Sequence, residues 1–399
     1  MISPSLALLA SIFVILILLR LKLHPGYAIF IGGCILAPTI LPLRSIPSLI
    51  WDSLIDQATI RLLIVIACAL TLSSLMEIKG LLVRLAKAME SIGPKLAIHV
   101  IPAAIGLVPM PGGALVSATT VRDILKRLSL SPRQSTFINF WFRHIWEFSI
   151  PVYPAVIITS AALSVPLLSV VKATFPMTAA AVALGIPVSY WMLRKSTPVK
   201  GKPSKYIAYE LIKVCWPILL LVILILLKVE PMIAFPLTLV LLAVQQRVNW
   251  PELKKALKYG LNPKILLLLY AIMMYKAVIE TSGAAGILIN DMESIGLPPL
   301  LILVVLPFLM GWTAGLSNAF AGISFPLLVP YIGLGAGMNG SSLLLAYVSG
   351  MIGVLLSPLH LCFILSAEYF KTSLGSVYRY TIPLCMAMET IAVVIYLVG

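Results

Sequence analysis

The chain has 399 residues, of which 60% are hydrophobic and only 11% are charged. An ordinary soluble domain contains about 25% charged residues, so this composition excludes a water-soluble globular protein. The net charge is +15, because 29 Lys and Arg residues outnumber 14 Asp and Glu residues. In a chain that must lie in a lipid bilayer, this excess indicates topology rather than nucleic-acid binding, and we expect no nucleic-acid partner.

Apolar windows of about 20 residues, the length needed to cross a hydrocarbon core as a helix, recur along the chain. They predict an all-α polytopic membrane protein with about ten transmembrane helices. The predicted spans are 4–20, 26–43, 60–77, 136–164, 173–193, 210–228, 231–246, 263–280, 341–369 and 381–398. The first run lacks the basic segment and the cleavage site of a signal peptide, so we interpret it as a membrane helix.

Two further apolar stretches, 96–118 and 299–327, are interrupted by proline and glycine near the middle. These residues break helices, so we predict two re-entrant hairpins that enter the membrane and return to the same side. If both termini lie outside, the inner loops contain 23 of the 29 Lys and Arg residues. This bias follows the positive-inside tendency and indicates a multi-pass protein of the cytoplasmic cell membrane.

The two halves of the chain resemble each other, since the sequence MESIG at residues 89–93 recurs at 292–296. Each half contains five predicted crossings and one hairpin, and an odd number of crossings makes the second copy inverted. We predict a first inverted repeat at 1–193, a basic cytoplasmic linker at 194–209 and a second inverted repeat at 210–399. Matched interruptions in two inverted halves indicate the binding site of a secondary transporter. The alternative is a duplicated scaffold with kinked helices and no transport.

The first hairpin has its interruption around Pro111, Gly112 and Gly113. Proline donates no backbone hydrogen bond and glycine accepts unusual backbone angles, so free N–H and C=O groups are expected at membrane depth. A helix that begins at about Gly113 would direct its N–H groups toward an anion, while the carbonyl groups before the break suit a cation such as sodium. Ser117 belongs to the same stretch and is a further candidate ligand.

The second hairpin contributes neutral oxygen ligands at Thr313, Ser317, Asn318 and Ser324. The alternative to a ligand role for each Ser or Thr is a structural hydrogen bond to the carbonyl oxygen four residues earlier in its own helix. We expect no metal other than a possible sodium ion, held by the two hairpin tips at Gly112, Gly113, Ser317 and Asn318. The five cysteines show no CxxC spacing and predict neither disulfides nor a thiolate metal site: Cys34, Cys68, Cys215, Cys362 and Cys385.

The fourth span contains Arg143, His144 and Glu147, and then breaks at the sequence PVYP, which includes Tyr153. Arg143 and Glu147 are four residues apart on one helical face, so they can form an ion pair that reduces the cost of burying both. This pairing is either structural or functional. His144 is expected on another part of the helix, where it either titrates near neutral pH or packs at the inner interface.

The matching ninth span breaks at the sequence SPLH, from Ser357 to His360. His360 lies next to a helix break near the middle of the membrane. It is therefore the better candidate of the two histidines for a functional role, and Ser357 is a candidate ligand at the same break.

Four motifs together resemble an uncharacterised prokaryotic membrane-protein family of the ion-transporter superfamily, which includes gluconate, lactate, citrate and dicarboxylate permeases. The motifs are PMPGGA at 109–114, RHIWE at 143–147, GISFP at 322–326 and SPLHL at 357–361. The resemblance implies two inverted repeats, each with a hairpin and a broken helix, in a homodimer that works by an elevator motion. Divalent anion–sodium symporters of this superfamily carry Ser-Asn-Thr at both hairpin tips, whereas here the tips read GGA at 112–114 and SNA at 317–319.

We therefore expect a secondary active transporter of a small organic anion of the carboxylate class, coupled to H⁺ or Na⁺. Its substrate would lie between the hairpin tips and the helix breaks, and no cofactor is expected beyond the coupling ion. The alternatives are an intramembrane enzyme that modifies lipid or peptide, and a lipid carrier on the same fold. For an enzyme, the sequence GLSNA at 315–319 matches the GxSxG nucleophile motif only in part.

Overall fold

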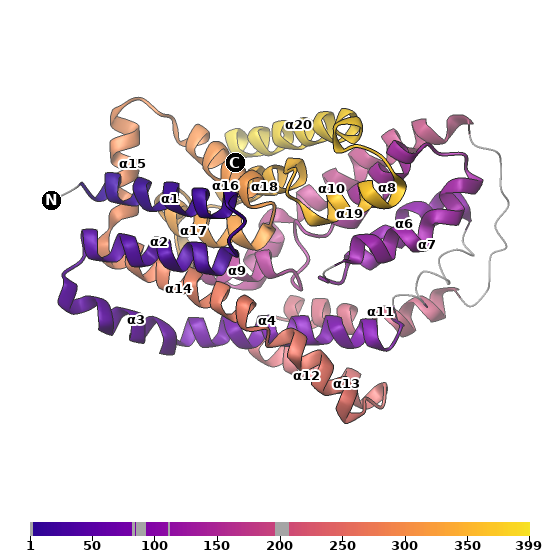
Figure 1. Ribbon diagram of the computed structural model, residues 1–399, viewed down its shortest axis with the longest axis horizontal. Helices are drawn as coiled ribbons and strands as arrows, with labels where there is room; N and C mark the ends of the chain where they lie inside the picture. The colour runs from indigo at the N-terminus through magenta and orange to yellow at the C-terminus, as the bar shows by residue number, and fades with distance from the viewer. Residues whose placement is uncertain (1–2, 82–83, 85–92, 111, 196–206) are drawn as a thin grey trace.

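A computed structural model describes residues 3–81, 84, 93–110, 112–195 and 207–399 (Figure 1). Within these residues the chain is helical and contains no β-strand, which confirms the predicted all-α class. Large apolar side chains remain exposed around the outside, among them Phe13, Ile223, Val240 and Met386. Lipid is the natural cover for such a surface, as expected for a multi-pass membrane protein.

The first half of the chain builds two helices, a short helix, a long helix, a hairpin, a broken helix and a closing helix. These elements are α1 (Pro4–Arg20), α2 (Pro25–Ile40), η1 (Leu43–Ser45), α3 (Ile46–Ile55), α4 (Gln57–Ile78), α6 (Pro94–Gly106), α7 (Gly113–Arg127), α8 (Pro132–His144), α9 (Pro154–Ala162), α10 (Leu167–Met192) and η2 (Leu193–Lys195). Residues 82–83 and 85–92, between α4 and α6, lie outside the described residues.

The second half runs through the same order of elements. They are α11 (Ile207–Leu226), α12 (Pro231–Gln245), α13 (Trp250–Gly260), α14 (Pro263–Ser282), α15 (Ala284–Ser294), α16 (Pro299–Ala314), α17 (Ser317–Ile332), η3 (Gly335–Gly337), α18 (Gly340–Leu356), α19 (Leu361–Phe370) and α20 (Leu374–Val398). Proline opens many helices of both halves, where its missing N–H costs nothing and its fixed φ favours the first turn.

Five helical segments of the described chain are long and apolar enough to cross a membrane: Gln57–Ile78, Leu167–Met192, Trp250–Ser282, Gly340–Phe370 and Leu374–Val398. They include five of the predicted spans, at 60–77, 173–193, 263–280, 341–369 and 381–398. The other apolar helices are shorter, with 10–17 residues. The total of about ten crossings, together with the side on which each terminus lies, stays a prediction.

Equivalent helices of the two halves make equivalent contacts. The second arm of the first hairpin, α7, packs against α19, and the second arm of the second hairpin, α17, packs against α9. Likewise α3 packs against α14, and α13 packs against α4. Each hairpin thus contacts the broken helix of the opposite half. These contacts bring the interruptions of both halves toward the centre of the molecule (Figure 1).

One glycine in each hairpin allows that hairpin to approach the broken helix of its own half closely. A Cβ atom on Gly106 would collide with the backbone carbonyl of Arg143 where α6 crosses α8. In the same way, a Cβ atom on Gly311 would collide with the backbone carbonyl of Gly350 where α16 crosses α18. Gly106 and Gly311 therefore play the same part in the two hairpins.

Candidate functional site

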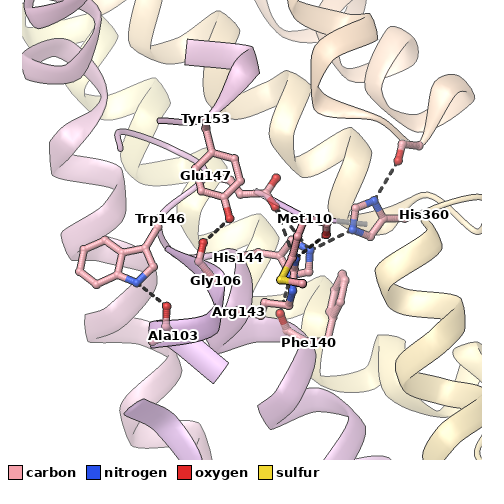
Figure 2. A network of polar contacts seen from close by, with 11 residues as sticks. Ala103, Gly106, Met110, Phe140, Arg143, His144, Trp146, Glu147, Tyr153 and His360 are labelled. Carbon is pink, nitrogen blue, oxygen red and sulfur yellow. Dashed lines mark hydrogen bonds and ion pairs between the residues drawn. The ribbon is translucent and has the colours of Figure 1, made fainter. Parts of the chain in front are cut away.

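The tip of the first hairpin is bonded to the break of the first half. Arg143 donates from Nη2 to the carbonyl oxygen of Met110 at 3.4 Å, and the Tyr153 hydroxyl donates to the carbonyl oxygen of Gly106. Trp146 adds a third bond, from Nε1 to the carbonyl oxygen of Ala103 at 2.9 Å. The side chains of the break therefore satisfy carbonyl groups at and near the end of α6, where the helix leaves them free (Figure 2).

The tip of the second hairpin is bonded to the break of the second half in the same manner. His360 places Nδ1 2.9 Å from the carbonyl oxygen of Gly315, and Ser357 donates from Oγ to the carbonyl oxygen of Trp312 at 2.6 Å. Gly315 has a left-handed backbone, with φ of 62°, which lets α16 end and the chain turn into α17.

The two breaks also contact each other. Nε2 of His144 lies 3.0 Å from Nε2 of His360, and the Tyr347 hydroxyl donates to the backbone carbonyl oxygen of Glu147 at 2.9 Å. These side chains are buried, with exposed fractions of 2% for Arg143, 1% for His144, 6% for Glu147 and 6% for His360. The structure thus brings all four interruptions of the chain together in one buried region.

Arg143 and Glu147 form the predicted ion pair, with Nη1 3.7 Å from Oε1. His144 also reaches this carboxylate, with Nε2 3.8 Å from the same Oε1, so the expectation that His144 points elsewhere is wrong. The reason is that residues three apart, like residues four apart, are neighbours on a helical surface, so His144 and Arg143 both reach Glu147. The break begins at Ile145, ahead of the predicted PVYP sequence.

Arg143 has hydrogen-bonding capacity to spare. Its Nε is buried and has no hydrogen-bond partner among the described residues, and its contacts to Met110 and Glu147 are long. The guanidinium also lies against the first residue of α7, because a Cβ atom on Gly113 would be 2.6 Å from Nη2. A fixed cation thus adjoins the positive end of a helix dipole.

At the first tip the helix begins where the sequence predicts, whereas Ser117 is engaged elsewhere. Helix α7 begins at Gly113, and Gly112 precedes it with a left-handed φ of 73°. Pro111 lies outside the described residues. Ser117 does not face the break, because its Oγ donates to Oδ1 of Asn139 at 2.5 Å.

The residues of the second tip are less uniform. Ser317 and Asn318 are the first residues of α17 and are partly exposed, and among the described residues no histidine or carboxylate is hydrogen-bonded to Ser317. Ser324 is buried and its Oγ has no partner within the described chain. Thr313 is not free to act as a ligand, because its hydroxyl donates to the carbonyl oxygen of Leu309, four residues earlier in its own helix, at 2.6 Å. A sodium ion at the two tips stays a prediction.

The sequence analysis did not identify three polar residues of this region, which are Asn139, Ser366 and Cys362. Asn139 donates from Nδ2 to the carbonyl oxygen of Ala114 at 3.1 Å and to Oγ of Ser366 at 2.9 Å, joining α8 to α7 and α19. Cys362 places its Sγ within 4.8 Å of the ligand nitrogens of His144 and His360, so these three residues could hold a metal ion. A polar residue in an apolar span is a weak signal, and only the fold shows which partners it meets.

A separate cavity of about 990 Å³ opens at the end of α9 away from the break. Its lining includes three basic residues, Arg61, Lys172 and Lys228, and two acidic ones, Asp56 and Glu230. Arg61 is paired with Glu230 at 3.0 Å. In the predicted topology, with both termini outside, these three basic residues fall in outer loops, so the cavity would open on the outer side.

The whole chain matches one known protein family. The model described as "Protein of unknown function (DUF401)" aligns with residues 2–398. This chain belongs to the DUF401 family. No curated protein matches the DUF401 chain in sequence. Among solved structures, it is similar to the YdaH transporter of Alcanivorax borkumensis, whose crystal structure was described as revealing an unusual topology. The two share 14% identity and a TM-score of 0.62, over 99% of this DUF401 chain and 98% of that chain, which shows a common fold.

Proposed function

We propose that this protein is a secondary active transporter of a small organic anion of the carboxylate class. The observation that carries the proposal is the meeting of two hairpin tips and two helix breaks around buried Arg143. Interrupted helices in corresponding places of two repeats are the usual construction of a transporter site. The likeness in fold to a transporter supports the same function.

The anion is recognised by Arg143 together with the N-terminus of α7. Arginine presents a planar fork of donors that matches a carboxylate, and the buried Nε is free to complete a bidentate contact. The N–H groups at the start of α7 favour a second negative group beside the guanidinium. Glu147 stabilises Arg143 when the site is empty and yields part of that contact to the substrate.

Alternating access follows from two inverted repeats that move relative to each other. Each break is hydrogen-bonded to its own hairpin, so a hairpin and the end of its broken helix can move as one unit. In this proposal the two copies are 1–193 and 210–399, and the protein is a homodimer in the cytoplasmic membrane with both termini outside. The cavity lined by Arg61, Lys172 and Lys228 is the outer vestibule through which an anion approaches.

The coupling ion is H⁺ or Na⁺. The partly exposed Ser317 and Asn318 and the backbone around Gly112 and Gly113 offer oxygen ligands of the kind that sodium prefers. A reconstituted system separates the two ions, because a sodium gradient and a pH gradient can be imposed one at a time.

The test is uptake of labelled mono- and dicarboxylates into proteoliposomes that contain the purified protein. We expect gradient-driven uptake of at least one carboxylate, and a loss of at least about tenfold in Arg143→Lys, because lysine lacks the bidentate fork. Arg122→Lys is the matched control, since Arg122 lies on α7 but its side chain is exposed at the surface. Folded protein that takes up no carboxylate under either gradient would overturn the proposal.

A further inference from the structure

His144, His360 and Cys362 bring three side-chain ligands from both halves of the chain to one point. Nε2 of His144, Nε2 of His360 and Sγ of Cys362 all lie within 4.8 Å of one another. The two histidines are buried, and Cys362 as a whole residue is partly buried. His144 is the last residue of α8, and the other two flank the first residue of α19.

The hydrogen bonds of the two histidines determine where their protons lie. Nδ1 of His144 is 2.5 Å from the carbonyl oxygen of Phe140, and Nδ1 of His360 is 2.9 Å from the carbonyl oxygen of Gly315. A carbonyl oxygen can only accept, so in each neutral ring Nδ1 carries the proton and donates it. Both Nε2 atoms then present lone pairs.

These two lone pairs face each other across 3.0 Å (Figure 2). Cys362 places Sγ within 4.8 Å of both nitrogens, but one S–H group can satisfy only one of them. A buried pair of acceptors with no donor between them is unfavourable. The geometry therefore favours a cation between the rings, which is either an additional proton or a metal ion.

Three features favour a metal ion. Metal-bound histidines almost always donate their other ring N–H to a carbonyl or carboxylate, which is the arrangement of both rings here. Cys362 adds a sulfur ligand that a proton shared between two nitrogens does not need. Glu147 lies beside the pair, with Oε1 3.8 Å from Nε2 of His144, and a carboxylate is a further ligand that such ions accept.

The distances and ligand types suit an ion of the zinc class. Zinc bonds to nitrogen at about 2.0–2.1 Å and to sulfur at about 2.3 Å, so the rings need to part by only a few tenths of an ångström. Two imidazoles and one thiolate are typical ligands of Zn²⁺ and are unsuitable for Mg²⁺ or Ca²⁺. Glu147 is within reach of the fourth position, since its Oε1 is 3.8 Å from Nε2 of His144.

We propose that His144, His360 and Cys362 bind one divalent transition-metal ion in tetrahedral geometry, with the fourth position facing Glu147. The Cys362 thiol loses its proton to solvent when the ion binds. The ion joins the two broken helices, and this site does not depend on what the protein transports.

The experiment is a Co²⁺ titration of the full-length protein in detergent, stripped first with a chelator. We expect tetrahedral cobalt bands and a thiolate-to-cobalt charge-transfer band that saturate at one ion per chain and disappear when Zn²⁺ is added. Cys362→Ser abolishes the charge-transfer band, and His360→Gln weakens binding at least about tenfold. Cys385→Ser, which alters a buried cysteine of α20, is the matched control and leaves both bands unchanged.

Melting of the chelator-treated variants shows whether they fold, and Cys362→Ser is nearly isosteric with the native residue. Wild-type protein that binds no Co²⁺ in the micromolar range would overturn the proposal and leave a shared proton between the rings. A charge-transfer band that persists in Cys362→Ser, or a stoichiometry well above one, would also overturn it.

Discussion

The α carbon of Gly106 lies so close to the backbone carbonyl of Arg143 that a side chain on Gly106 would not fit. This approach holds the first hairpin against its broken helix and places the carbonyl of Gly106 within reach of the Tyr153 hydroxyl. The position of the arginine in the site therefore depends on a glycine in another helix.

Replacing Gly106 by alanine should lower stability by about 1–3 kcal/mol, because the added methyl group overpacks a backbone contact. The measurement is thermal melting of the purified protein in detergent. Gly286→Ala is the control, since a Cβ atom on Gly286 meets nothing within 4 Å, and it should leave the melting temperature unchanged or slightly higher. Equal melting temperatures for Gly106→Ala and wild type would contradict the close packing.

Replacing Asn139 by alanine should cost about 1–3 kcal/mol for each buried group left without a partner. The change removes the acceptor of Ser117 and the donor to Ser366, both inside the protein. Thr119→Ala is the control, because Thr119 is exposed and bonds only to its own helix. A melting temperature that falls no further in Asn139→Ala than in the control would show that this network contributes nothing.

Replacing both Lys172 and Lys228 by glutamine should raise the KM for anion uptake by about two- to tenfold at low salt, with kcat little changed. The two residues line the cavity and attract anions without touching the buried site. The effect should shrink as ionic strength rises, since screening shortens the reach of exposed charges. Lys254→Gln with Lys255→Gln, both exposed on α13, is the control. An unchanged KM at low salt would contradict the proposal that this cavity is the outer vestibule.

His24 should make stability depend on pH below neutrality. It lies between α1 and α2, and partial burial and Lys264 lower its pKa from 6.5. Its neutral Nδ1 accepts from the backbone N–H of Gly26 at 3.2 Å. As pH falls through 6.5 the unfolded chain takes up a proton that the folded protein resists, so stability decreases until the pH is below the folded pKa. His24→Asn keeps a capping side chain and should lose less melting temperature between pH 7 and pH 5 than wild type does.

The interruptions could be predicted from the sequence because proline and glycine act locally. The start of α7 at Gly113 needs only a neighbouring left-handed glycine, and the pairing of Arg143 with Glu147 needs only residues close in sequence. The start of the first break could not be placed, since α8 ends at His144, before the prolines that mark the break in the sequence.

The contacts between the halves could not be predicted in the same way. His144 and His360 are 216 residues apart, and Asn139 and Ser366 are 227 apart. Their spacing carries no periodic signal, because only the packing of α8 on α19 brings them together. For the same reason, nothing in the sequence distinguished Cys362 from the other cysteines of the apolar segments.

The crossed packing of the two halves has a consequence for assembly. Each short helix before a long span supports the long helix of the other half, α3 on α14 and α13 on α4. Neither half then completes its own surface, and a chain cut within 196–206 should fold only when both pieces are synthesised in the same membrane. The two copies behave as partners in an obligate heterodimer that happens to be encoded as one polypeptide.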